Sequence, residues 1–185
     1  MKIVVAITGT PGTGKTTISR RVAGKLGSCE LISANDLVKE KGLYTGHTKD
    51  GEIIVDMRKL GSEIGRRIRS SSSDAIIIEG HLLCDIRVNG AVAIVIREHL
   101  GTLLDRMEKR GYGRKKIEDN IVAEAIDYCG VNAMGNYTEV YEIESGAVAV
   151  DQILRIIKGG RPKNKDIEML GELDSILKKL GKAVI

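Results

Sequence analysis

The sequence predicts an α/β protein built on a doubly wound, parallel sheet of five strands. Short continuous apolar runs at 3–7, 75–78 and 91–96 have the pattern of strands buried on both faces, because a half-exposed strand would alternate apolar and polar residues. Longer segments with helical periodicity lie between these runs. A length of 185 residues fits one domain, so we expect a single core over 1–185.

Each predicted strand leads into a predicted helix. The first strand is followed by a glycine-rich loop and a helix at 16–26, whose apolar residues recur every fourth position. The strand at 91–96 precedes a helix with one apolar face at 99–110. A strand at 138–143 and a helix at 148–157 complete the alternation.

Two segments interrupt the alternation and are predicted to be insertions. Residues 35–73 should hold two helices around a charged, glycine-rich loop at 42–51, and residues 110–128 should hold a turn and then a charged helix. Beyond the basic loop at 159–166, an amphipathic helix is expected at 166–181. This last helix either docks on the core or meets a partner.

The composition favours anionic ligands and a reducing compartment. With 29 basic and 25 acidic residues, the net charge of +4 is too small for a dedicated nucleic-acid binder, and without Trp or Phe any RNA contact should be indirect or weak. The three cysteines form no CxxC pair, which favours a cytoplasmic protein. No apolar stretch approaches the roughly 18 residues of a membrane span, so no membrane contact is expected.

The motif GTPGTGKT at 9–16 matches the phosphate-binding loop GxxxxGK[ST] in full, between a predicted strand and a predicted helix. Its glycines allow the backbone N–H groups to wrap a phosphate at the positive end of the helix. Lys15 can reach the β and γ phosphates of ATP, and the Thr16 hydroxyl can bind Mg²⁺. The sequence therefore predicts a P-loop NTPase that uses ATP and Mg²⁺.

Glu79 and His81 follow the strand at 75–78 and should emerge at the carboxyl edge of the sheet. Glu79 is the predicted second metal group, acting through water, although a carboxylate there could also only cap a loop. His81 is a candidate catalytic residue. It either positions or deprotonates an attacking group, or it donates a hydrogen bond to the loop.

Three arginines are candidates for the γ phosphate. Arg106 and Arg110 lie one helical turn apart, next to a glycine-bounded turn that could close over the site, and Arg97 ends the preceding strand. The alternative for each is a solvated surface position.

These motifs, together with RGY at 110–112 and the basic helix KKIEDNIVAE that follows, resemble the CINAP-type adenylate kinase-like family over roughly residues 1 to 160. The resemblance implies a nucleoside monophosphate (NMP) binding insertion at 32–55 and a short lid at 109–119. It implies that Arg110 is the lid arginine and, with Lys15, a catalytic residue. The residues implied to hold the ATP phosphates are Gly12, Gly14, Lys15, Thr16 and Thr17.

The chain departs from the family pattern at three places. Glu79 stands where the family usually has Asp, and Ser145-Gly146 replaces an Asn-Lys pair near the adenine. Leu83 stands where ordinary adenylate kinases have an arginine for the AMP phosphate, so Arg58, Arg66 or Lys39 would have to replace it.

The resemblance implies a broad NMP kinase that transfers the ATP γ-phosphoryl to AMP, with ATPase activity and a role in small ribosomal subunit and pre-16S rRNA maturation. The alternative is an ATPase that serves as an assembly factor, with little kinase activity, and grips a ribosomal protein of the small-subunit platform. A third, weaker interpretation is a kinase for another small acceptor.

Overall fold

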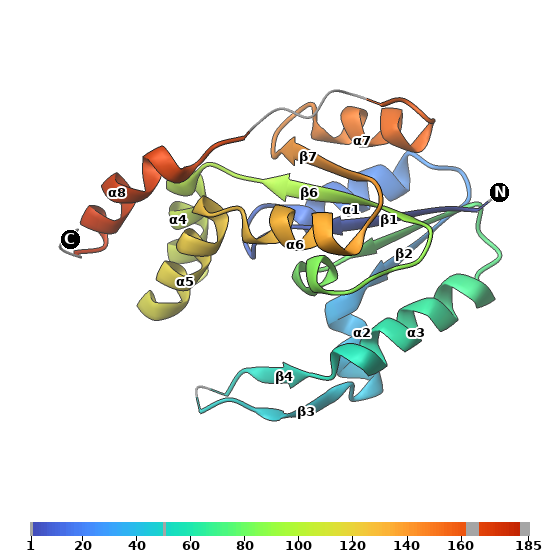
Figure 1. Ribbon diagram of the computed structural model, residues 1–185, viewed down its shortest axis with the longest axis horizontal. Coiled ribbons are helices and arrows are strands. Elements are labelled where there is room, and N and C mark those ends of the chain that lie inside the picture. Colours follow the sequence, from blue (N-terminus) through green and yellow to red (C-terminus); the bar gives the residue numbers. More distant parts are fainter. Residues whose placement is uncertain (1, 50, 162–166, 182–185) are drawn as a thin grey trace.

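The computed structural model describes residues 2–49, 51–161 and 167–181. The strands of its main sheet are β1 (Ile3–Thr8), β2 (Cys29–Ser33), β5 (Ala75–Glu79), β6 (Ala91–Arg97) and β7 (Val140–Glu144). They pair in parallel in the order β2-β5-β1-β6-β7, which confirms the predicted doubly wound fold (Figure 1). A separate antiparallel hairpin joins β3 (Tyr44–His47) and β4 (Ile53–Val55).

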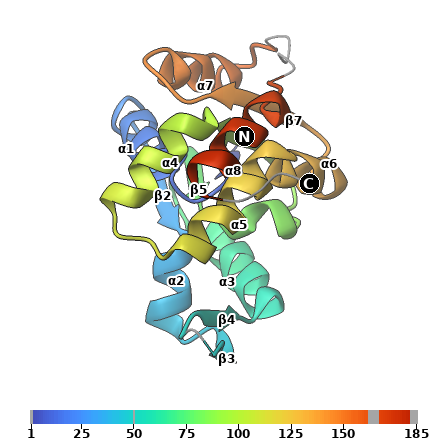
Figure 2. The ribbon, with the colours of Figure 1, turned by 90° about the vertical axis from the view of Figure 1, so that its left-hand side faces the viewer.

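Helices connect the strands and cover both faces of the sheet (Figures 1 and 2). Their bounds are α1 (Lys15–Gly24), α2 (Ala34–Lys41), α3 (Met57–Ser70), the 3-10 helix η1 (His81–Asp85), α4 (Leu100–Lys109), α5 (Arg114–Ala125), α6 (Tyr128–Asn136), α7 (Ala149–Ile157) and α8 (Leu170–Lys179). None of the described helices is long and apolar enough to cross a membrane.

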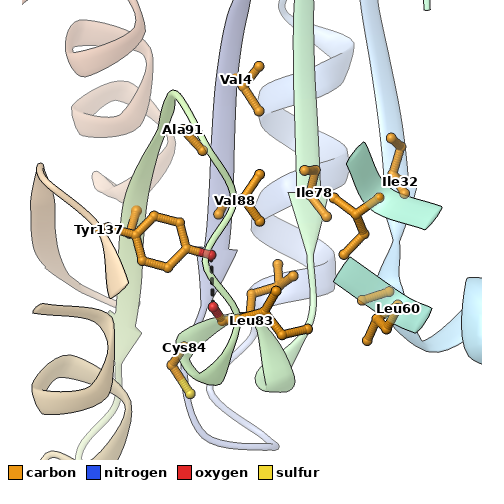
Figure 3. Packing of buried hydrophobic residues seen from close by; sticks show 14 of the residues in the cluster. Val4, Ile32, Leu60, Ile78, Leu83, Cys84, Val88, Ala91 and Tyr137 are labelled. Atoms are coloured by element: carbon orange, nitrogen blue, oxygen red, sulfur yellow. Dashed lines mark hydrogen bonds between the residues drawn. The ribbon is translucent and has the colours of Figure 1, made fainter. Parts of the chain in front are cut away.

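Successive side chains of each central strand point to opposite faces of the sheet, so they pack into two different hydrophobic cores. In β1, Val4 and Ala6 pack with η1, α3 and α6, whereas Val5 and Ile7 pack with α1 and α7. Figure 3 shows the first of these cores, where the Tyr137 hydroxyl donates a hydrogen bond to the Leu83 carbonyl at 2.8 Å. Because both faces are covered, the central strands are continuous apolar runs.

The first insertion differs from its prediction in one respect. Helices α2 and α3 are present as expected. Ser33 caps the N-terminus of α2, and its hydroxyl accepts a hydrogen bond from the backbone N–H of Asp36. The segment 42–51 was expected to be a loop, but it contains β3 and the turn of the hairpin. The hairpin is short and mostly exposed, so its sequence lacks the apolar alternation that marks a strand.

Helix α8 docks on α4 and α5 instead of standing free (Figure 2). Met169 and Ile176 are buried there, and the Glu172 carboxylate accepts a hydrogen bond from the backbone N–H of Leu100 at 3.0 Å, at the first turn of α4. The same carboxylate lies 2.6 Å from Nδ1 of His99. The basic loop predicted at 159–166 lies largely outside the described residues.

Candidate active site

The phosphate-binding motif forms the turn between β1 and α1. Gly9, Gly12 and Gly14 have φ values of 137°, 98° and 95°, in the region that side chains other than glycine avoid. A Cβ at Gly9 would collide with the backbone carbonyl of Ile96, so the loop also needs glycine to approach β6. Thr17 lies in the first turn of α1 with its side chain exposed. The loop therefore has the backbone geometry that a phosphate requires.

Lys15 is buried within this loop, with 7% of its surface exposed. Its Nζ donates a hydrogen bond to the Thr10 carbonyl at 2.9 Å. Burial lowers the pKa of Lys15 to about 8, although the nearby Cys129 thiol and Glu79 carboxylate act in the opposite direction. A cation held in so little water attracts a phosphate more strongly than an exposed lysine would.

Glu79 and Thr16, the two residues predicted to bind the metal, are in contact. The Thr16 hydroxyl donates a hydrogen bond to Oε2 of Glu79 at 3.0 Å, and Glu79 ends β5 beside β1 and β2. The described residues hold no cluster of three or more His, Cys, Asp or Glu side chains that could bind a metal. Mg²⁺ fits such a site, because in kinases it takes most of its oxygens from phosphates and water and only a few from the protein.

His81 lies beyond Glu79 at the start of η1, half-buried. Burial, the Lys15 charge and the Lys116 charge lower its pKa from 6.5 to about 4, so the imidazole is neutral at physiological pH. Its backbone carbonyl accepts a hydrogen bond from the Thr8 hydroxyl at 3.2 Å, whereas its ring has no partner among the described residues. A neutral imidazole with a free nitrogen can accept a proton or orient an attacking group.

Arg106 contacts the phosphate loop directly, and Arg110 does not. Nη1 of Arg106 donates a hydrogen bond to the Gly12 carbonyl at 3.1 Å and lies 2.6 Å from Oε2 of Glu98. Arg110 is exposed at the end of α4, just before Gly111, which has a φ of 69°. The lid role of this turn stays a prediction.

Arg97 is a structural residue, which corrects its place among the phosphate candidates. Only 1% of its surface is exposed, and Nε lies 3.0 Å from Glu124. Nη1 lies 2.7 Å from both Asp127 and Glu142. Three carboxylates thus enclose the guanidinium, so it is not available to a phosphate. The sequence shows only that Arg97 ends a strand, and this position does not distinguish an arginine in a buried ion pair from one that contacts a ligand.

A cleft of about 420 Å³ adjoins the Thr16–Glu79 pair. It runs between α1 and α2, and its charged lining comes mainly from α1, α2 and α3: Arg20, Asp36, Lys39, Glu40 and Arg67. Arg67 pairs with Glu30 at 2.8 Å, whereas Arg20 and Lys39 form no ion pair with any described residue. The cleft therefore has room and two free cations for an anionic acceptor beside the phosphate loop.

The lining of this cleft shows which of the residues suggested for binding the acceptor phosphate lie near the site. Lys39 lines it, whereas Arg58 does not and Arg66 pairs with Glu63 on the exposed side of α3. Arg20 was missed, although it lies one helical turn after Thr16 and so must share its face of α1. That four-residue spacing is the signal by which the sequence could have indicated it.

A larger cavity of about 590 Å³ lies at the other end of the sheet, where β6 and β7 begin. Its lining includes Arg87, Asn136 and Arg161, and none of the candidate site residues. Open parallel sheets bind ligands at the carboxyl ends of their strands, so the smaller cleft beside Glu79 is the candidate site.

Comparisons with known proteins agree with this geometry. The family model described as an AAA domain matches residues 5–127. A "Putative adenylate kinase" of Pyrococcus furiosus is 32% identical over 162 residues, which cover 85% of this chain and 86% of that protein. Another of the same name, from Methanocaldococcus jannaschii, is 36% identical over 159 residues and covers 83% and 85% of the two chains.

Solved structures show the same fold at low sequence identity. Shikimate kinase from Acinetobacter baumannii superposes with a TM-score of 0.56 at 16% identity, over 88% of this chain and 97% of that one. Shikimate kinase from Bacteroides thetaiotaomicron gives 0.53 at 15% identity, over 95% and 98%. Fold and site thus define a P-loop phosphotransferase. Within that class, the chain belongs to the adenylate kinase-like family of P-loop kinases, which are nucleotide kinases.

Proposed function

We propose that this protein is an NMP kinase that transfers the γ-phosphoryl group of ATP to AMP with the help of Mg²⁺. The observation that carries the proposal is the cleft beside the Thr16–Glu79 pair, because it has two unpaired cations, Arg20 and Lys39, where an acceptor phosphate would lie. The family supports a nucleotide as the acceptor, and the names of the relatives support AMP.

The reaction needs positioning and charge neutralisation more than covalent chemistry. An acceptor phosphate oxygen attacks the γ phosphorus, the bond to the β–γ bridging oxygen breaks, and two ADP molecules result. Lys15, Arg106 and Arg110 would offset the negative charge on the phosphates. The Thr16 hydroxyl would bind Mg²⁺, and Glu79 would hold it through water. The glycine-rich loop would bind the β phosphate through its backbone N–H groups.

ATP hydrolysis is the second candidate activity, and His81 favours it. Its imidazole is neutral, has no partner among the described residues and lies in the field of Lys15. Such a group could orient a water molecule when no acceptor is bound. The partner of an ATP-driven assembly factor, a ribosomal protein of the small-subunit platform, stays a prediction.

A product balance separates the two activities. Purified protein is incubated with Mg²⁺ and ATP, with and without AMP, and chromatography follows AMP, ADP, ATP and free phosphate together. NMP kinase activity consumes one AMP and yields two ADP for each ATP. Free phosphate with AMP unchanged would contradict the kinase proposal and establish hydrolysis.

A further inference from the structure

Glu98 is a buried carboxylate that the predicted site did not include. It follows β6 directly, and 5% of its surface is exposed. A carboxylate buried to this extent is costly unless a cation and hydrogen bonds compensate its charge. The compensation comes from the candidate active site itself.

The compensating cation is Arg106. Oε2 of Glu98 forms an ion pair with Nη1 of Arg106 at 2.6 Å, but it accepts no hydrogen bond from any described residue. The same Nη1 donates a hydrogen bond to the Gly12 carbonyl at 3.1 Å. The other oxygen, Oε1, accepts a hydrogen bond from the backbone N–H of His99 at 3.2 Å. A carboxylate, a guanidinium and a phosphate-loop carbonyl are thus connected in series.

The backbone of Glu98 is itself held in place. Its N–H donates a hydrogen bond to Oε1 of Glu124 at 2.9 Å. The same oxygen accepts a hydrogen bond from Nε of Arg97 at 3.0 Å. Glu124 belongs to α5, on the far side of the lid turn from Arg106. The backbone of Glu98 is therefore anchored and its side chain is buried, whereas the side chain of Arg106 is long and 37% exposed.

Helix packing alone does not orient the Arg106 guanidinium. Leu103 and Met107 of α4 lie against Gly12, which fixes the backbone of the helix relative to the loop. An arginine side chain has several rotatable bonds and loses up to about 2 kcal/mol of rotamer entropy when it is held. Only Nη1 is engaged by the described residues, so the other guanidinium N–H groups remain available for phosphate oxygens.

We propose that Glu98 is a positioning residue that holds Arg106 against the phosphate loop, so that its free N–H groups face the γ phosphate of ATP. The proposal rests on the proposed function, because it assigns Arg106 to the transferred phosphate. Without Glu98 the guanidinium would sample orientations that do not reach that phosphate, and this loss would reduce turnover more than ATP binding.

The test is a double-mutant cycle with the variants E98Q, R106Q and E98Q/R106Q. E98Q should lower kcat by about 10-fold or more, with a change in the KM for ATP of less than about 3-fold. In the R106Q background, E98Q should have no further effect, because a residue that acts only through Arg106 has nothing left to position. Additive losses, or wild-type kcat in E98Q, would overturn the proposal.

Three controls complete the experiment. D105N removes an exposed carboxylate from the same helix and should keep wild-type kcat. E98D keeps the charge and should recover part of the kcat lost in E98Q, and it replaces E98Q in the cycle if thermal unfolding shows that E98Q does not fold. If wild type does not phosphorylate AMP, the proposed function fails, and the same cycle measured on ATP hydrolysis still decides the role of Glu98.

Discussion

Lys116 of α5 and Glu52 of the β3–β4 turn form an ion pair, with 2.7 Å between Nζ and Oε1. The two residues are 64 positions apart in the chain and belong to the two insertions of the fold. Both charges also influence the pKa of His81. The predicted lid and the predicted NMP-binding insertion therefore touch each other through this pair.

Loss of this ion pair should affect acceptor binding and leave stability nearly unchanged. Exposed pairs contribute about 1 kcal/mol or less, so K116A and E52Q should unfold at nearly the wild-type temperature. We expect the KM for the acceptor to rise a few-fold in both variants, and the difference from wild type to shrink at high salt because salt screens the pair. Steady-state kinetics at two ionic strengths measure this effect. K178A, whose lysine forms an exposed pair with Asp174 on α8, is the control.

Replacement of Lys15 by methionine should abolish phosphoryl transfer without unfolding the protein. The ammonium group is the buried cation of the phosphate loop, and loss of one such charge typically costs about 100-fold or more in kcat. The product balance measures activity, and thermal unfolding tests the fold. K25M changes an exposed lysine at the end of the same helix and should remain active. Full activity in folded K15M would exclude a kinase mechanism at this loop.

Glu79 should set the magnesium requirement. In E79Q the Thr16 hydroxyl keeps an acceptor but the metal loses a negative charge, so a higher Mg²⁺ concentration should be needed for half-maximal activity. A titration of activity with Mg²⁺ at fixed ATP measures the shift. E40Q changes another carboxylate that lines the cleft and should keep the wild-type magnesium dependence. An unchanged requirement in E79Q would assign Glu79 to loop capping.

His81 should make the protein less stable as the pH falls from 6.5 to about 4. Its folded-state pKa is about 4, below the ordinary value of 6.5, so within this window the unfolded chain takes up a proton that the folded protein does not. The free energy of unfolding therefore falls through the window and then levels off. Urea unfolding of wild type and H81N from pH 4 to 7 isolates this contribution. H47N, on the exposed hairpin, should follow wild type.

Arg97 should be essential for stability, not for nucleotide binding. R97M would remove the cation that faces the buried Glu124 and the partly buried Asp127 and Glu142, and breaking a buried pair in this way costs about 3–5 kcal/mol. Urea unfolding measures the loss. R155M, at an exposed position of α7, should change stability by about 0.5 kcal/mol or less. A fully stable R97M variant would show that the network is dispensable.

Four strands of the main sheet, β1, β5, β6 and β7, were predictable, whereas the edge strand β2 and the hairpin were not. β5 is buried along its whole length and so is a continuous apolar run, but β2 lies at the edge of the sheet and buries only Ile32 fully. The hairpin strands are short and largely exposed. α6 also escaped prediction, since Gly130 and Gly135 interrupt its pattern. Periodicity identifies an element only where burial selects its residues.

The sequence by itself determined the P-loop, the strand–helix alternation and the position of Glu79. These features depend on contiguous residues, because eight neighbouring positions specify the backbone of the loop and one strand specifies the edge at which it ends. Tertiary structure alone decided that Arg97 is structural, that Glu98 pairs with Arg106 and that Lys116 meets Glu52. These ion pairs join residues that are not neighbours in the chain, so they depend on how the chain folds. The sequence around each residue does not specify its partner.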